Sequence, residues 1–81
     1  PETSYRVKIN VQGEYANTER AMRLLMQSGL LIKEIKVFEL TMEKRELQIC
    51  ARKPNAKQFD LLVERLQKLV EVQSIVVNKC D

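Results

Sequence analysis

Two hydrophobic periods alternate along this chain, and their order predicts which elements of secondary structure it forms. Apolar and polar side chains alternate over residues 5–12, a period of two that is typical of a half-buried strand. A helical spacing follows over residues 17–28, and Gly29 offers the left-handed conformation at which helices often stop. Two more strands, a second helix and a final strand over residues 72–79 complete the order β-α-β-β-α-β.

The two helices are predicted from apolar residues that recur every three or four positions. Asn17 or Thr18 is the expected N-cap of the first helix, because either side chain can accept a hydrogen bond from a free N–H group. Pro54 ends the third strand, and Asn55 is the expected cap of the second helix. The apolar rows are Ala21, Met22, Leu25 and Met26 in the first helix, and Phe59, Leu62, Val63, Leu66 and Leu69 in the second.

The second strand, over residues 30–41, breaks the simple alternation. Ile35 and Val37 share one face, whereas Phe38 and Leu40 share the other. A bulge or a strongly twisted edge near Val37 would reconcile the two sets. The hairpin turn falls at or beside residues 43–46, and the third strand follows it. The inward side chains of that strand are Leu47, Ile49 and Ala51, and its outward side chains are Gln48, Cys50 and Arg52.

This order of elements predicts an α+β ferredoxin-like sandwich. Its four-stranded antiparallel sheet has the strand order 4-1-3-2, and two helices cover one face. The length of 81 residues suits one core, so residues 1–81 are expected to form a single domain. In this order the strands that carry Cys50 and Cys80 are not neighbours. We therefore expect no disulfide between them, and a reducing compartment.

The residue inventory argues against enzymatic activity. The chain has no His, which removes the commonest general base near neutral pH and the usual zinc ligand set. Cys50 lies mid-strand, where a thiol is usually a small packing residue. Neither an acidic calcium-loop motif nor a Gly-rich phosphate loop occurs. We expect no catalytic residue, no cofactor and no metal site.

Charge and composition also argue against nucleic acid as the partner. The net charge is only +3, and basic and acidic residues are interspersed. An RNA-recognition motif has this architecture and stacks bases on aromatic residues in the middle of strands one and three. None of the outward residues there is aromatic. They are Lys8, Asn10, Gln48, Cys50 and Arg52.

Association with another protein makes the fewest demands on the residues. The second strand carries more apolar side chains than one buried face explains. A second copy of the chain, another part of a parent protein or a local bulge could cover the excess. The predicted interaction edge consists of Val37, Phe38, Leu40 and Met42.

The chain resembles the ACT-like C-terminal cytoplasmic domain of the MgtC/SapB family, bacterial inner-membrane proteins associated with magnesium limitation. The resemblance spans nearly all 81 residues and rests on packing positions. The segments that carry it are YRVKI at residues 5–9, IKEIKV at 32–37, LQICA at 47–51, and residues 66–77, which end in VQSIVV.

The resemblance implies a non-enzymatic regulatory or protein-interaction domain, excised from a longer membrane protein that is linked to magnesium homeostasis. The polar residues 1–4 and the missing initiator Met agree with an excised piece. The domain would be soluble and lie on the cytoplasmic side of the inner membrane, with its parent embedded there. Its partner would be a second copy or the rest of the parent chain. Direct Mg²⁺ binding is not expected, because the acidic residues are scattered.

An amino-acid-sensing ACT regulatory domain is the alternative function. Such domains often bind amino acids where the loop after the first strand meets the first helix. In this chain Gly13 keeps the turn and Asn17 offers polar atoms, but the Pro-Gly element usual in that loop is missing. Gly13 and Asn17 are therefore the candidate ligand loop, and the simpler interpretation of the two is a strand exit and a helix cap.

Overall fold

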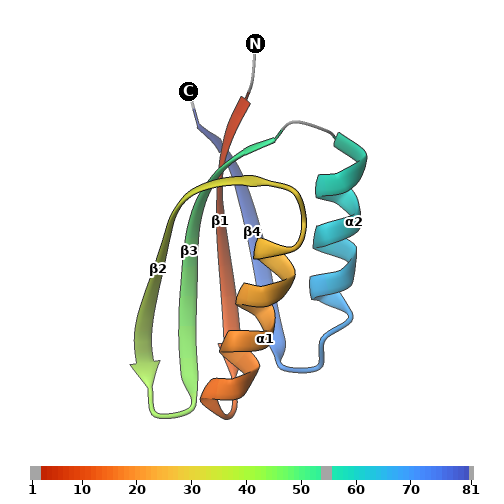
Figure 1. The fold of residues 1–81 in the computed structure, drawn as a ribbon. Helices are drawn as coiled ribbons and strands as arrows, with labels where there is room; N and C mark the ends of the chain where they lie inside the picture. Colours follow the sequence, from red (N-terminus) through yellow and green to blue (C-terminus); the bar gives the residue numbers. More distant parts are fainter. Residues whose placement is uncertain (1–2, 54–55, 81) are drawn as a thin grey trace.

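Six elements follow one another in the order that the two hydrophobic periods predict. The computed structural model describes residues 3–53 and 56–80, and both helices lie on one side of the sheet (Figure 1). The elements are β1 (Thr3–Gln12), α1 (Tyr15–Met26), β2 (Leu31–Thr41), β3 (Lys44–Lys53), α2 (Ala56–Gln67) and β4 (Val72–Cys80).

The sheet is antiparallel and has the order β2-β3-β1-β4, which is the predicted 4-1-3-2 order read from the other edge. The ferredoxin-like fold class is therefore confirmed. β1 lies between the strands that carry Cys50 and Cys80, as expected, and Cys50 is a free, half-buried thiol. No helix in the described ranges is long and apolar enough to cross a bilayer.

The core lies between the sheet and the two helices and consists of aliphatic side chains with one aromatic residue, Phe59. Burial of a large aliphatic side chain stabilises the fold by about 1.5–3 kcal/mol, so this layer supplies most of the driving force. Tyr5 closes one end of the core by placing its ring 5.3 Å from that of Phe59. The fully or largely buried apolar residues are Val7, Ile9, Val11, Ala21, Leu25, Leu30, Leu47, Ile49, Ala51, Phe59, Leu62 and Leu66.

The first helix begins earlier than predicted. Its N-cap is Glu14, without a side-chain capping bond, so the predicted cap at Asn17 or Thr18 is wrong. Both side chains have other partners. The Asn17 amide donates to the carbonyl of Gln12 in β1, and the buried Thr18 hydroxyl accepts from Arg45. The helix ends at Met26, and Gly29 then has the predicted left-handed conformation, with φ of +81°. The predicted strand stop at Pro54 and cap at Asn55 lie outside the described residues.

The second strand is irregular, but not where the sequence predicts. The register shifts lie between Ile32 and Glu34 and between Glu39 and Thr41, whereas Val37 pairs regularly with Leu47. The bulge predicted near Val37 is therefore wrong. A single extra residue at position 33 turns two isoleucines three positions apart, 32 and 35, toward the same face.

The hairpin that follows is tighter than the charged run suggests. Only Met42 and Glu43 form the turn, and Lys44 already pairs with Gln12 as the first residue of β3. The predicted alternation of β3 is confirmed, with Leu47, Ile49 and Ala51 buried and the intervening side chains facing away from the helices.

Candidate functional site

The loop between β1 and α1, predicted to hold a ligand, is built from tight internal contacts. Gly13 has a φ of +94°, and its N–H donates to the carbonyl of Glu43 at 2.8 Å. The side-chain amide of Asn17 donates to the carbonyl of Gln12 at 3.1 Å and accepts from Arg20 at 3.4 Å. A Cβ at position 13 would lie 2.6 Å from Nδ2 of Asn17. The positive φ therefore favours glycine here, and an added Cβ would displace the Asn17 amide from its hydrogen bond with Gln12.

A buried arginine joins this loop to the hairpin and to α1. Arg45 is only 4% exposed, and its Nε donates to Oγ1 of Thr18 at 2.6 Å. One terminal nitrogen donates to the carbonyl of Gly13, and the other donates to that of Met42 at 3.4 Å. The guanidinium also lies 5.3 Å from the ring centroid of Tyr15, within the range of a cation–π interaction. A buried charge of this kind is stable only because its donors are paired.

Neither Arg45 nor Thr18 was recognised from the sequence as part of a cluster, although the periods contain the signal. Arg45 is in phase with the inward residues Leu47 and Ile49 of β3. Thr18 lies three and seven positions before Ala21 and Leu25, on the buried stripe of α1. A charged residue in phase with a core strand and a hydroxyl in phase with a core helix stripe predict a buried pair.

An ion pair connects the same end of the molecule to the segment after α2. Arg20 contacts the carboxylate of Glu71 at 2.5 Å, and the carbonyl of Glu71 accepts from the N–H of Gln12 at 2.9 Å. A hydrogen bond from the backbone N–H of Glu71, together with the Arg20 guanidinium, holds the pKa of this carboxyl below its ordinary value. Burial opposes this shift but does not overcome it.

The polar atoms predicted to meet a ligand at this loop are thus engaged within the chain. The N–H and carbonyl of Gly13 and both side-chain polar atoms of Asn17 have partners. An open hollow of about 400 Å³ lies beside the two residues, against Val70 and Glu71. A ligand that bound there would have to replace existing bonds or use the rim of the hollow.

The predicted interaction edge lies in the C-terminal half of β2 and in the hairpin turn that follows it. Val37, Phe38, Leu40 and Met42 are 36%, 42%, 56% and 95% exposed. They do not share one face of the sheet: Val37 pairs with Leu47 on the helix side, and Phe38 pairs with Glu46 on the opposite side. Among the described strands β2 pairs with β3 alone, so one row of its backbone N–H and C=O groups faces outward.

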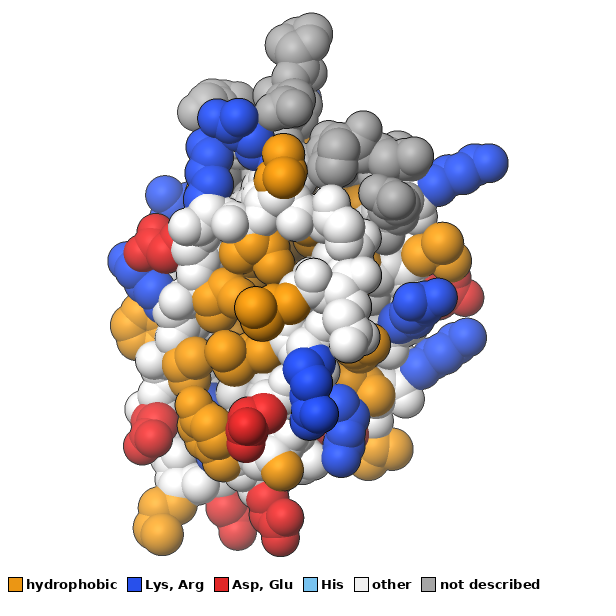
Figure 2. Space-filling view, in the orientation of Figure 1, with side chains coloured by type: hydrophobic (Ala, Val, Ile, Leu, Met, Phe, Trp, Pro, Cys, Tyr) orange, Lys and Arg blue, Asp and Glu red, His pale blue; other side chains and the backbone are white. Residues whose placement is uncertain are grey.

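The helix side of the same edge is apolar as well. α1 packs on β1 and α2 packs on β4, which leaves the β2 side of the sheet with little cover. Figure 2 shows hydrophobic side chains gathered there, over the strands beside the helices. Ile32 and Ile35 are half-buried on this side and pack against the core. Apolar side chains therefore flank the free edge of β2 on both faces of the sheet.

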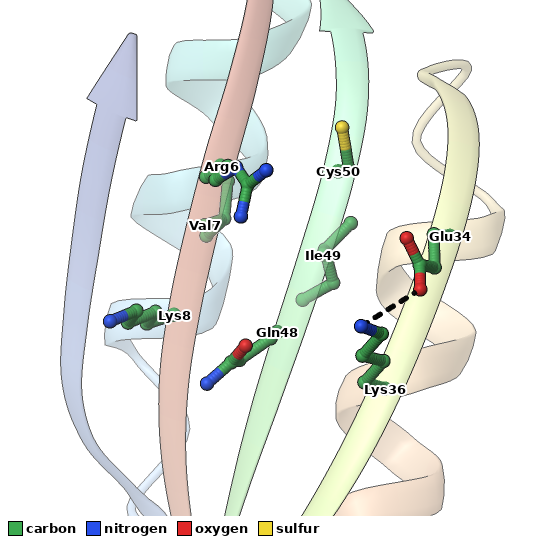
Figure 3. Close-up of a pocket in the computed structure, with 8 residues that line it drawn as sticks. All are labelled: Arg6, Val7, Lys8, Glu34, Lys36, Gln48, Ile49 and Cys50. Atoms are coloured by element: carbon green, nitrogen blue, oxygen red, sulfur yellow. Dashed lines mark ion pairs between the residues drawn. The ribbon is translucent and has the colours of Figure 1, made fainter. Parts of the chain in front are cut away.

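The opposite face of the sheet is mostly polar. Figure 3 shows Arg6, Lys8 and Gln48 on this face, with the Lys36–Glu34 ion pair of 3.2 Å beside them on β2. The hollow between these side chains holds about 80 Å³, well below the roughly 300–1,000 Å³ of ordinary small-molecule pockets. Within residues 3–53 and 56–80 there is no group of three or more His, Cys, Asp or Glu residues that could hold a metal ion.

No protein-family model matches this sequence, and no curated protein matches it. Solved structures do. The ACT domain of a GTP pyrophosphokinase from Chlorobium tepidum superposes with a TM-score of 0.83 at 12% identity, covering 96% of this chain and 100% of that one. The fold is ACT-like.

Two further structures define how far this likeness extends. The C-terminal domain of the MgtC protein from Mycobacterium tuberculosis has a TM-score of 0.80 at 13% identity, covering 98% of this chain and 88% of that one. A de novo designed protein, Foldit4, has a TM-score of 0.64 at 17% identity, covering 100% and 98% of the two chains. The resemblance to the MgtC domain is thus matched by a shared fold, and a designed protein with that fold shows that the scaffold alone implies no function.

Proposed function

We propose that this chain is a non-enzymatic regulatory or protein-interaction domain that acts through contacts of β2. Its parent would be an MgtC/SapB-like inner-membrane protein linked to magnesium homeostasis, with the domain on the cytoplasmic side. The fold likeness to the C-terminal domain of MgtC and the sequence resemblance over residues 5–77 support this assignment.

The observation that carries the proposal is the exposed, apolar edge of β2. Phe38 and Leu40 expose about half of their surface beside a row of unpaired backbone groups. Such an edge is a template for another strand, and natural proteins usually protect it with charges, prolines or a covering segment. A second copy fits, because two antiparallel β2 strands related by a two-fold axis would each present the same groups to the other.

Sedimentation equilibrium from micromolar to millimolar concentration tests the association. We expect a monomer–dimer equilibrium that Phe38→Glu shifts toward the monomer, because the new carboxylate would be desolvated at the interface. Val76→Glu is the matched control. Val76 lies on the other edge strand, on the same face of the sheet, and is 49% exposed compared with 42% for Phe38. A wild-type chain that stays monomeric at millimolar concentration would contradict the proposed self-association.

Amino-acid sensing is the second candidate. The hollow beside Gly13 and Asn17 favours it, as does the fold likeness to an ACT domain. A ligand that binds only the folded state stabilises it by RT ln(1 + [L]/Kd) and so raises the melting temperature as its concentration rises, so a thermal-shift panel of amino acids tests this function. A shift that Asn17→Ala abolishes would favour the sensor, and a panel without any shift would leave the interaction domain as the better explanation.

A further inference from the structure

The face of the sheet that points away from the helices holds an excess of positive charge. Strand pairing and alternation place five basic and two acidic described residues on it, a difference of +3. This equals the net charge of the whole chain, so the remaining charges cancel. The basic residues, all exposed, are Arg6, Lys8, Lys36, Lys44 and Arg52, and the acidic residues are Glu34 and Glu46.

The two acidic residues leave the central cations uncompensated. Glu34 pairs with Lys36 at 3.2 Å, and Glu46 accepts a hydrogen bond from Gln48 at 2.8 Å. Arg6 lies opposite Cys50 and Asn78 on the neighbouring strands, and Lys8 lies opposite Gln48 and Val76. The cross-strand neighbours of both cations on β1 are therefore neutral, and Figure 3 shows both side chains on the open side of the strand.

We propose that this basic face docks on an anionic lipid headgroup surface, that of the bilayer in which the parent protein is embedded. The inference rests on the proposed function for the presence of that bilayer. Three features favour lipid over other anions. The cations are spread across three strands of a sheet face that the helices leave open, the hollow between them is too small for an organic ligand, and β1 and β3 carry no outward aromatic side chain on which nucleic acid bases could stack.

The expected affinity of the basic face for an anionic membrane is that of a domain held near the bilayer by its parent protein. Each basic residue close to an anionic surface strengthens binding by about fivefold, so a net charge of three gives weak binding to free vesicles. A parent protein that holds the domain near the membrane would raise the effective concentration of headgroups and make this contact significant. Binding would orient the sheet toward the lipid and the helices away from it, which leaves the β2 edge accessible to a second copy.

Co-sedimentation with vesicles tests the proposal. The 81-residue chain is mixed with vesicles of phosphatidylcholine alone or of phosphatidylcholine and phosphatidylglycerol in equal parts, at low and physiological salt. We expect binding to the anionic vesicles only, weakening as salt screens the charges. The triple variant Arg6→Gln/Lys8→Gln/Lys36→Gln should bind more than tenfold more weakly, since three charges of about fivefold each are removed.

The matched control removes the same charge from the helix side. Arg23→Gln/Arg65→Gln/Lys68→Gln changes three exposed residues on or next to the helices, and it should retain at least half of the wild-type binding. Circular dichroism verifies that both triple variants are folded. Equal loss in both variants, absence of binding, or tighter binding to single-stranded RNA through the same three residues would each overturn the proposal. Self-association measured by sedimentation is independent of this result, so failure of either proposal is distinguishable from failure of the other.

Discussion

Met42 and Arg45 are three residues apart in the same hairpin, yet their environments are opposite to what their side chains would suggest. The thioether side chain of Met42 is 95% exposed, whereas the guanidinium-bearing Arg45 is 4% exposed. Exposed apolar residues are common on proteins, but a buried arginine is rare unless it is paired. This difference in exposure shows that one hairpin has two roles, one within the fold and one at the surface. The buried charge ties the chain to itself, and the apolar edge beside it is available to another molecule.

Replacement of the buried arginine should have the largest effect on stability. Arg45→Met removes the partner of the Thr18 hydroxyl and of the Gly13 carbonyl, so we expect a loss of about 3 kcal/mol in the free energy of unfolding. Urea denaturation measures it. Lys44→Met is the control, since Lys44 is exposed and should change stability by less than about 0.5 kcal/mol. Equal effects of the two variants would show that the Arg45 contacts do not hold the hairpin in place.

The glycine of the loop should be the next most sensitive position. Gly13→Ala adds backbone strain at φ of +94° and a methyl group 2.6 Å from Asn17, which together should cost about 2–3 kcal/mol. Gly29→Ala controls for the strain alone, because φ there is +81°, and it should cost about 1–2 kcal/mol. If both variants lose the same amount in thermal unfolding, the close approach of Asn17 contributes nothing.

The hydroxyl that accepts from Arg45 should contribute less than the arginine itself. Thr18→Val keeps the shape of the side chain and should cost about 1–2 kcal/mol, because a buried charged donor loses its acceptor. The double variant with Arg45→Met should lose less than the sum of the two single losses, since both remove the same bond. Additive losses in urea denaturation would contradict a direct interaction.

The apolar edge should give the reverse result, with a large effect on association and almost none on folding. Phe38→Ser/Leu40→Ser should change the unfolding free energy of the monomer by less than about 0.5–1 kcal/mol, because both side chains are already about half exposed. The same variant should abolish the dimer in sedimentation. A large loss of monomer stability would mean that the two residues belong to the core of the fold.

The smallest effect should come from the ion pair at the end of the molecule. The pKa of Glu71 is lowered in the folded chain, so its contribution to stability is complete above the unfolded glutamate pKa of about 4.3 and is lost as the pH falls through the lower folded value. Urea midpoints of the wild type and Glu71→Gln should therefore converge at acidic pH. A constant difference between them down to the lowest pH measured would exclude this linkage.

Most of the fold could be predicted because burial on one face of a sheet enforces strict alternation. β1, β3 and α2 each have one buried side, and their inward residues follow the period without exception from Val7 to Val11 and from Leu47 to Ala51. Edge strands lack this constraint, so the register shifts in β2 could not be located from the pattern alone. The positions of these register shifts depend on how β2 pairs with β3, so the sequence of β2 alone does not determine them.

The sequence predicted only part of the candidate loop: it singled out Gly13 and Asn17 but not the buried Arg45 that binds beside them. Gly13 and Asn17 were identified as a loop, and the cap assigned to Asn17 or Thr18 was wrong because propensity considers each residue without its tertiary partners. A short polar side chain near a helix start usually caps it. Here the Thr18 hydroxyl instead accepts a hydrogen bond from Arg45, which lies 27 positions further along the chain. The interaction edge at Val37, Phe38, Leu40 and Met42 is exposed in the structure, and its partner stays a prediction.

Hydrogen exchange of the backbone amides on the two edge strands tests the central claim most directly. β2 and β4 each have one row of N–H groups that faces away from the sheet, so they serve as mutual controls in one sample. As the protein concentration rises from micromolar to millimolar, the outward amides of β2 should become protected while those of β4 remain unchanged. Exchange rates on β2 that do not depend on concentration, or protection that develops on β4 instead, would contradict association through the β2 edge.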